Sequence, residues 1–149
     1  MTSHAFIKGL GKNIPNNKIT NNHFVDLGLD TSDQWITERT GIKHRYYTDQ
    51  ETASSDLAYQ ASLQAIENAG ITTADIDLII CATTTPDHLS FPSTACILQN
   101  KLACKNIGAF DISAACSGFC FGLSVASQFI MAHTAETILV VGVDCMSSI

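Results

Sequence analysis

The sequence predicts an α/β fold with a mostly parallel sheet and helices on both of its faces. Apolar runs of strand length alternate along the chain with amphipathic stretches of helix length. Residues 76–82 (IDLIICA) form an almost unbroken apolar run, which is typical of a strand covered on both faces. Each connection is long enough for a right-handed crossover, so we expect residues 1–149 to form one domain.

The first third of the chain predicts one strand and one short helix. Ala5–Leu10 is the expected strand, which ends near the turn residue Pro15. Residues 31–41 (TSDQWITERTG) predict a helix that Thr31 or Ser32 caps and that the terminal glycine ends. Residues 14–52 as a whole are polar and depart from the alternating pattern. This segment is therefore a candidate lid or ligand-recognition insertion.

Two helices flank the buried run at 76–82. The first has Ser54 or Ser55 as its cap and ends at Gly70, and its alanines at every fourth position predict close packing on the sheet. Pro92 fits the first position of the second helix, which extends to Leu102.

The last third predicts a strand, a long helix and a further strand. The strands are Ile107–Ile112 and Thr137–Val143, and both are rich in apolar residues. Between them, apolar residues at helical spacing continue from residue 119 to about residue 133.

Composition excludes several classes of function. Eight basic and fourteen acidic residues give a formal net charge of −6, without a basic stripe for nucleic acid. We expect no membrane span and no secretion signal, because the apolar runs are too short for either. The six cysteines lack CxxC spacing, which favours free thiols in a reducing cytoplasm over a disulfide framework or a metal site.

Cys116 is the strongest candidate for chemistry. It lies in a turn of small residues between the strand at 107–112 and the following helix, at the strand's carboxyl end. A thiol at a helix N-terminus is favoured as the thiolate, which is the form that attacks carbonyl groups. By position alone, Cys116 is either such a nucleophile or one more small buried residue.

Four segments in the same order resemble β-ketoacyl-acyl-carrier-protein synthase III, a family of thiolase-fold condensing enzymes. DISAACSGF (Asp111–Phe119) is similar to the family's active-cysteine segment. The other similar segments are DTSDQWITERTGIKHR (Asp30–Arg45), ATTTPDHLSFPSTACILQ (Ala82–Gln99) and ILVVGVD (Ile138–Asp144). The resemblance covers essentially the whole chain and implies the N-terminal half of a thiolase-like enzyme.

The resemblance implies an enzyme that initiates fatty acid synthesis. Cys116 would take an acyl group from acyl-coenzyme A, acetyl-coenzyme A in the simplest case, and condense it with malonyl-acyl-carrier protein. Coenzyme A enters this reaction as part of a substrate, and the resemblance implies no separate cofactor and no metal. It also implies a homodimer of full-length chains.

The resemblance further implies five substrate-binding residues. Trp35 and Arg39 would hold the coenzyme A nucleotide, with Thr31 as a weaker member of that set. Phe91 would reach an acyl pocket across a dimer interface, and Met146 would line that pocket. Structural roles stay open for four of them: Trp35 could be a core anchor, Arg39 a solvated charge near a helix end, Phe91 a staple over the next helix, and Met146 a gap filler.

One departure from the family concerns the catalytic His and Asn, which the resemblance places in the second half of a longer chain. None of the five histidines here, at positions 4, 23, 44, 88 and 133, has a matching context. We therefore expect acylation of Cys116 at most, and uncovered apolar surface. The alternatives are a non-catalytic truncated fragment, a cysteine hydrolase, or another thiolase-superfamily enzyme of polyketide, quinolone or hydroxymethylglutaryl synthesis.

Overall fold

A computed structural model describes residues 4–148 of the chain. Within these residues, the central sheet has three parallel strands in the order β4-β3-β5: β3 (Leu78–Ala82), β4 (Gly108–Ile112) and β5 (Ile138–Gly142). Every residue of the middle strand, β3, is buried. The predicted parallel sheet is confirmed, and each strand is one or two residues shorter than its predicted range.

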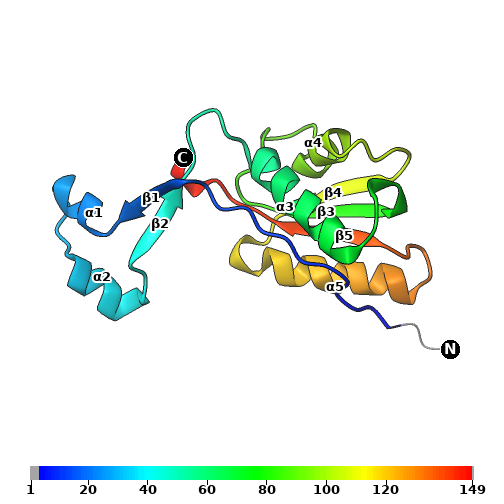
Figure 1. Ribbon diagram of the computed structural model, residues 1–149, viewed down its shortest axis with the longest axis horizontal. Coiled ribbons are helices and arrows are strands. Elements are labelled where there is room, and N and C mark those ends of the chain that lie inside the picture. The colour runs from blue at the N-terminus through cyan, green and yellow to red at the C-terminus, as the bar shows by residue number, and fades with distance from the viewer. Residues whose placement is uncertain (1–3, 149) are drawn as a thin grey trace.

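Helices cover both faces of this sheet, as predicted (Figure 1). One face carries α3 (Ser54–Ala69) and α4 (Thr94–Lys101), and the other carries α5 (Gly118–Met131). Because side chains alternate along a strand, Ile79 and Cys81 pack toward α3 and α4, whereas Leu78 and Ile80 pack toward α5. Short 3-10 helices occupy Thr73–Asp75, Ala115–Ser117 and Met146–Ser148.

The predicted cap of α3 is wrong. The N-cap position is Ala53, whose N–H donates to the Asp56 carboxylate at 2.9 Å. Ser54 and Ser55 lie inside the first turn, where both are buried. Their polar atoms bond to the loop after β3, so tertiary contacts have displaced the cap by one residue.

The start of α4 also differs from its prediction. Ser93 is the N-cap, and its hydroxyl accepts a hydrogen bond from the Cys96 N–H at 3.2 Å. Pro92 therefore stands before the cap and not at the first helical position. The apolar spacing of α4 predicts a core face of Ala95, Ile97, Leu98 and Leu102, of which all but the half-buried Ile97 are buried.

The predicted strand at Ala5–Leu10 is wrong. This segment pairs with no strand of the described chain and runs beside α3 (Figure 1). The contact is close, because a Cβ at Gly9 or Gly11 would overlap the α3 backbone. The alanine row of α3 thus packs on this segment, while Ala58, Ser62 and Ile66 are the residues of α3 that face the core.

Residues 14–52, which we call the projecting lobe, extend away from the three-layered body (Figure 1). The lobe contains an antiparallel pair of strands and two helices: β1 (Asn17–Thr20), α1 (Asn22–Asp26), α2 (Asp33–Thr40) and β2 (His44–Tyr47). Asn21 is fully buried at its centre and donates to Asp33 Oδ1 and to the Ile42 carbonyl, both at 2.8 Å. One side chain therefore joins the start of α1 to α2 and to the loop before β2.

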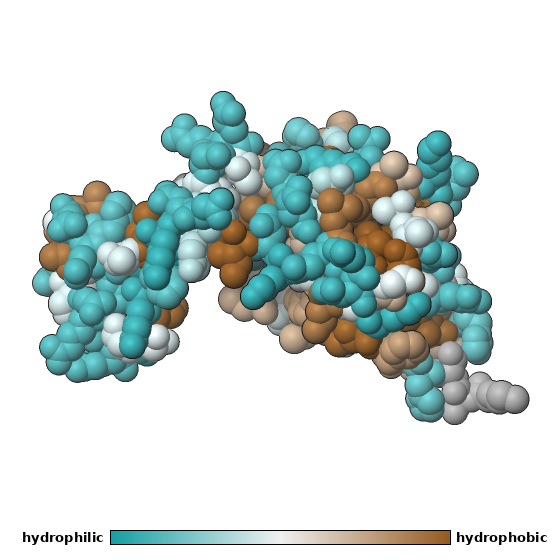
Figure 2. Space-filling model, viewed as in Figure 1, coloured by the Kyte–Doolittle hydropathy of each residue, from teal (hydrophilic) through white to brown (hydrophobic). Residues whose placement is uncertain are grey.

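Much apolar surface of the body is uncovered, as expected. Figure 2 shows brown patches over the body, whereas the lobe is mainly teal. Large apolar side chains that are at least 43% exposed include Phe6, Ile7, Leu10, Leu89, Phe91, Phe119, Phe121, Met131 and Met146. No helix in residues 4–148 combines the length and apolarity needed to span a bilayer.

Candidate active site

Three loops leave the carboxyl ends of the parallel strands at one edge of the sheet, which we call the carboxyl edge. They comprise residues 83–93 after β3, 113–117 after β4 and 143–148 after β5. The strands are paired in register and end level with one another. Ligands of open α/β sheets bind at this edge, so these loops are the first place to look for a site.

Each loop carries one of the residues that the sequence marked. Phe91 is 86% exposed on the first loop, Cys116 is exposed on the second, and Met146 is 64% exposed on the third. The structure therefore brings Phe91, Cys116 and Met146 to the same edge. Thr31, Trp35 and Arg39 lie on the projecting lobe instead.

A short turn presents Cys116 between β4 and α5. Ala115 has a positive φ of 46°, which is uncommon for a residue other than glycine and bends the chain sharply. The Ser117 hydroxyl donates to the Ala114 carbonyl at 2.7 Å and holds this bend. Gly118 is buried against β3, and a Cβ there would lie 3.1 Å from the Ala82 Cβ. Close packing of α5 on the sheet thus leaves Cys116 at the surface.

The other thiols contrast with Cys116. Cys81 lies in the middle strand and is fully buried, and burial, with a contribution from Asp111, raises the pKa of its thiol to about 12. Burial also raises the pKa of Cys104 and Cys145. All six cysteines are free, and Cys116 and Cys120 are the exposed ones. Exposure contradicts the interpretation of Cys116 as a small buried residue.

Asp111 connects the Cys116 strand to α4. It pairs with Cys81 in the sheet, and its two carboxylate oxygens accept the N–H groups of Thr94 at 2.8 Å and Ala95 at 2.7 Å. These two amides belong to the first turn of α4, which directly follows the loop that carries Phe91. Sequence reasoning did not assign Asp111 a role, although a carboxylate near the end of a strand was an available signal.

Asp144 makes a similar connection between the loops after β5 and β3. Its Oδ1 accepts from the Thr84 N–H at 2.7 Å, the Thr84 hydroxyl at 2.8 Å and the Thr83 hydroxyl at 3.3 Å. Thr85 continues the contact, because its hydroxyl accepts the Cys145 N–H at 2.8 Å. The threonine run at 83–85 thus fixes the loops after β3 and β5 together.

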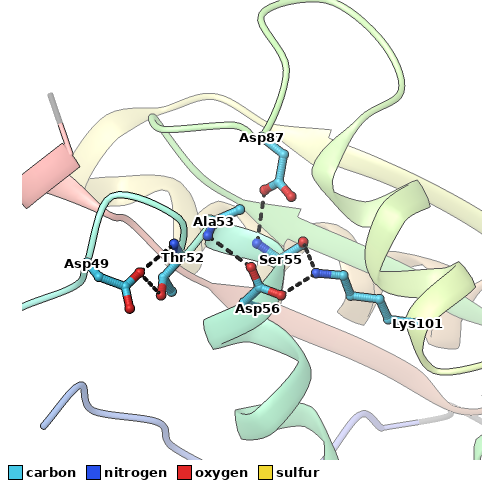
Figure 3. A network of polar contacts seen from close by, with 7 residues as sticks. All are labelled: Asp49, Thr52, Ala53, Ser55, Asp56, Asp87 and Lys101. Carbon is cyan, nitrogen blue, oxygen red and sulfur yellow. Dashed lines mark hydrogen bonds and ion pairs between the residues drawn. The ribbon is translucent and has the colours of Figure 1, made fainter.

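A polar network holds the start of α3 to the same edge (Figure 3). Asp87, from the loop after β3, accepts the Ser55 N–H at 2.9 Å. Lys101 of α4 donates to the Ser55 hydroxyl at 2.7 Å and forms an ion pair with Asp56 at 2.6 Å. The Lys101 hydrogen bond, together with the Ala53 N–H, lowers the pKa of Asp56. Both helices on this face are therefore anchored through their first or last turns.

On the projecting lobe, Trp35 and Arg39 are four residues apart and share one face of α2. The Arg39 guanidinium lies 4.6 Å from the centroid of the Trp35 ring, which is 51% exposed. Ser32 caps the helix by accepting the Trp35 N–H at 3.0 Å, and Gly41 ends it with a φ of 72°. Thr31 Oγ1 is buried without a hydrogen-bond partner in the described chain.

The lobe is tied to the carboxyl edge beside Met146. The Thr48 N–H donates to Ser147 Oγ at 3.1 Å, and the two hydroxyl oxygens are 3.0 Å apart. A groove of about 560 Å³ lies at this junction, between the N-terminal segment, β2, α3 and the loop after β5. Met146 lines the groove, whereas Cys116 and Trp35 do not.

One histidine of the described residues, His88, lies on a loop of the carboxyl edge, the loop after β3. Four of the five histidines are exposed, and His23 is half-buried against the rings of Phe24 and Tyr47 in the lobe. Within the described residues, no group of His, Cys, Asp and Glu side chains could hold a metal ion. The exposed thiol of Cys116 is the candidate nucleophile of the carboxyl edge.

Comparison with known proteins shows what the chain is similar to. The family model of 3-oxoacyl-[acyl-carrier-protein] synthase III matches residues 110–149, which include Cys116. A β-ketoacyl-[acyl-carrier-protein] synthase III of Xanthomonas campestris is 50% identical over 146 residues, 98% of this chain and 44% of its own. The corresponding crystal structure from Aquifex aeolicus superposes with a TM-score of 0.90 at 45% identity, over 95% of this chain and 45% of that one.

Over 97% of its length the chain is similar to β-ketoacyl-[acyl-carrier-protein] synthase III, of which it matches the N-terminal half. It spans less than half the length of the relatives it matches, 44% in the case of the Xylella fastidiosa synthase III. The thiolase-like fold is confirmed by the superposition. A priming β-ketosynthase of a polyketide pathway is also similar, with a TM-score of 0.85 at 30% identity, so the fold extends beyond synthase III.

Proposed function

We propose that this chain provides the nucleophile of an acyltransferase that initiates fatty acid synthesis. Cys116 takes an acyl group, acetyl in the simplest case, from coenzyme A and passes it to a carbanion formed from malonyl-acyl-carrier protein. The observation that carries the proposal is the exposed thiol of Cys116 at the β4–α5 turn. The names of the synthase III relatives support the reaction class.

The first step is a transfer between two thioesters. The Cys116 sulfur, as the thiolate, attacks the carbonyl carbon of the acyl-coenzyme A. The carbonyl oxygen carries negative charge in the tetrahedral intermediate, and the backbone N–H of Cys116 can donate to it. Collapse of the intermediate breaks the bond to the coenzyme A sulfur, which takes up the proton that Cys116 gave up. The products are an acyl-Cys116 thioester and free coenzyme A.

In this proposal, the projecting lobe recognises the nucleotide of coenzyme A. An exposed indole offers a stacking face for adenine, and a guanidinium binds phosphate through two parallel hydrogen bonds. Trp35 and Arg39 provide both groups on one helix face. The buried Thr31 hydroxyl supports a direct contact less well.

The acyl group itself would lie at the carboxyl edge. Phe91 and Met146 are exposed apolar side chains on the loops after β3 and β5, at the same edge as the Cys116 loop, and in this proposal they belong to the walls of acyl pockets. In a homodimer of full-length chains, Phe91 would extend into the neighbouring subunit, and its exposure suits that role. Six free thiols suit a reducing compartment such as the cytoplasm.

A second candidate is a non-catalytic folding unit. The exposed apolar side chains of the body favour it, because such surface usually belongs to an interface. The two candidates differ in whether the folded chain alone can form a thioester.

Intact-mass analysis after incubation with acetyl-coenzyme A separates these candidates. The proposal predicts a gain of one acetyl group in the wild type and in Cys120→Ala, and no gain in Cys116→Ala. Cys120 is the matched control because it is the other exposed thiol of the described chain. A folded sample without an adduct would favour the non-catalytic unit. Release of free acetate without a malonyl acceptor would indicate a cysteine hydrolase.

A further inference from the structure

Asn21 has a distinct place in the projecting lobe. Of residues 14–52, all of which the structure describes, it alone is buried, and none of its surface is exposed. Apolar side chains of the lobe such as Val25 and Leu27 are 42% and 64% exposed. The lobe therefore has a polar side chain where a small unit usually has an apolar core.

The Asn21 side chain holds α2 and the segment after it. Its Nδ2 donates to Asp33 Oδ1 and to the Ile42 carbonyl, both at 2.8 Å, and lies 3.3 Å from Thr37 Oγ1. The Asp33 carboxylate and the Ile42 carbonyl only accept hydrogen bonds, so the nitrogen of the amide must face them. The Asn21 Oδ1 is buried without a hydrogen-bond partner in the described chain, which costs free energy. The contacts to α2 are therefore retained despite an unfavourable oxygen.

These contacts fix one side of α2. Successive residues of an α-helix are about 100° apart around its axis, so Asp33 and Thr37 lie on the same side. Trp35 and Arg39 each follow one of them by two residues, about 200° further round, and so lie on the opposite side. Trp35 is accordingly 51% exposed, whereas Thr37 is half-buried. Since α2 contains no buried residue, its rotation depends strongly on the contacts of Asn21.

We propose that Asn21 is a positioning residue, which sets the rotation of α2 and so presents Trp35 and Arg39 to the nucleotide of coenzyme A. This inference rests on the proposed function of the lobe. Asn21 is buried on the other side of the helix and does not touch the ligand. It acts through Asp33, Thr37 and the chain that follows α2.

Two variants disturb these contacts in different ways. Asn21→Ala removes all of the hydrogen bonds that the side chain donates. Asp33→Ala removes one acceptor and leaves Asn21 in place. Because Asp33 is exposed, we expect this variant to fold, and circular dichroism checks the fold of both. Asp33→Ala keeps the proposal falsifiable if Asn21→Ala does not fold.

Glu38→Ala is the matched control for Asp33→Ala. Both variants remove an exposed carboxylate from α2, but Glu38 accepts its hydrogen bond from Gln34 of the same helix, at 2.7 Å. Loss of a negative charge near Arg39 by itself favours an anionic ligand such as coenzyme A. Charge therefore predicts unchanged or tighter binding in both variants. Loss of the Asn21 contact predicts weaker binding in Asp33→Ala alone.

Calorimetric titration with coenzyme A is the first measurement. We expect Kd to rise roughly tenfold in Asn21→Ala, as for the loss of one stacked base, and to rise in Asp33→Ala as well. Glu38→Ala should bind as the wild type does or more tightly. Hydrogen exchange of the α2 amides separates positioning from melting, because a rotated helix stays protected. Loss of protection throughout α2, or an unchanged Kd in both folded variants, would overturn the proposal.

A second readout needs no bound ligand. Trp35, the single tryptophan, faces outward, so rotation of α2 brings it toward the lobe and should reduce the quenching of its fluorescence by acrylamide. Melting of the helix would increase that quenching instead. If the wild type does not bind coenzyme A, the proposed nucleotide site fails, while the quenching still tests the role of Asn21. Quenching at the wild-type level in folded Asn21→Ala and Asp33→Ala would overturn that role.

Discussion

The Arg39 guanidinium lies over the ring of Trp35, 4.6 Å from its centroid. The contact is worth about 0.5–1 kcal/mol at an exposed site and holds the charge of Arg39 beside an open aromatic face. Stacking and phosphate recognition are thus prearranged on one short helix. The lobe that bears them is joined to the carboxyl edge through Thr48 and Ser147.

Replacing Arg39 by alanine should weaken coenzyme A binding. The loss of one exposed charge contact predicts up to about a fivefold rise in Kd. The salt dependence of binding should also flatten, because screening acts on that contact. Calorimetric titration at two ionic strengths measures both effects. Lys43→Ala, which removes an exposed cation elsewhere on the lobe, is the control; equal effects of the two variants would refute a specific role for Arg39.

Coenzyme A should change the fluorescence of the chain. Trp35 is its single tryptophan and is 51% exposed, so the signal reports on this residue alone. Stacking of adenine on the indole should quench the emission in a saturable manner. Pantetheine, which lacks the nucleotide, should leave the emission unchanged. Quenching by pantetheine alone would show that Trp35 contacts another part of the ligand.

Cys81 should make the fold sensitive to alkali. Its pKa is raised from 9.0 to about 12 in the folded chain, so the neutral thiol stabilises the fold below pH 9. As the pH rises from 9 toward 12, ionisation of this thiol in the unfolded chain lowers the free energy of unfolding by up to about 1.4 kcal/mol per pH unit. Urea unfolding of wild type and Cys81→Ala between pH 8 and 10.5 should show a flatter profile for the variant. Parallel profiles would contradict the prediction.

Asp56 should contribute to stability above acidic pH. Its contact with Lys101 lowers its pKa below the ordinary value of 3.8, so the stabilisation is present at neutral pH and is lost as the pH falls below about 4. Asp56→Asn should lower the free energy of unfolding by up to about 1 kcal/mol at pH 7, since the ion pair is partly exposed, and by much less at pH 3. Thermal unfolding at both pH values measures this. Glu67→Gln controls for the change in net charge, and a loss independent of pH would be inconsistent with the ion pair.

The layered fold was predictable because burial leaves a strong sequence signal. The apolar run that became β3 and the glycines that end α2 and α3 act through local chemistry. The strand predicted at Ala5–Leu10 was wrong because a strand needs a hydrogen-bonded neighbour. In the described chain this segment packs on α3 instead. The N-cap of α3 is Ala53 because Ser54 and Ser55 form hydrogen bonds with the loop after β3 instead.

The candidate site was predictable only in part. Position between a strand and a helix marked Cys116, and the family resemblance marked the lobe residues. The links made by Asp111 and Asp144 were not foreseen, because each joins segments that are distant in sequence. Hydrogen bonds between a carboxylate and distant backbone amides leave no periodic pattern in a sequence.

The central claim is that the sulfur of Cys116 accepts an acyl group. Peptide mapping by tandem mass spectrometry, on a wild-type sample quenched shortly after addition of acetyl-coenzyme A, tests it most directly. The account predicts an acetyl group on the peptide that contains Cys116, attached to that sulfur, with release of an equal amount of free coenzyme A. An acetyl group found on Cys120 or on lysine, with Cys116 unmodified, would contradict it.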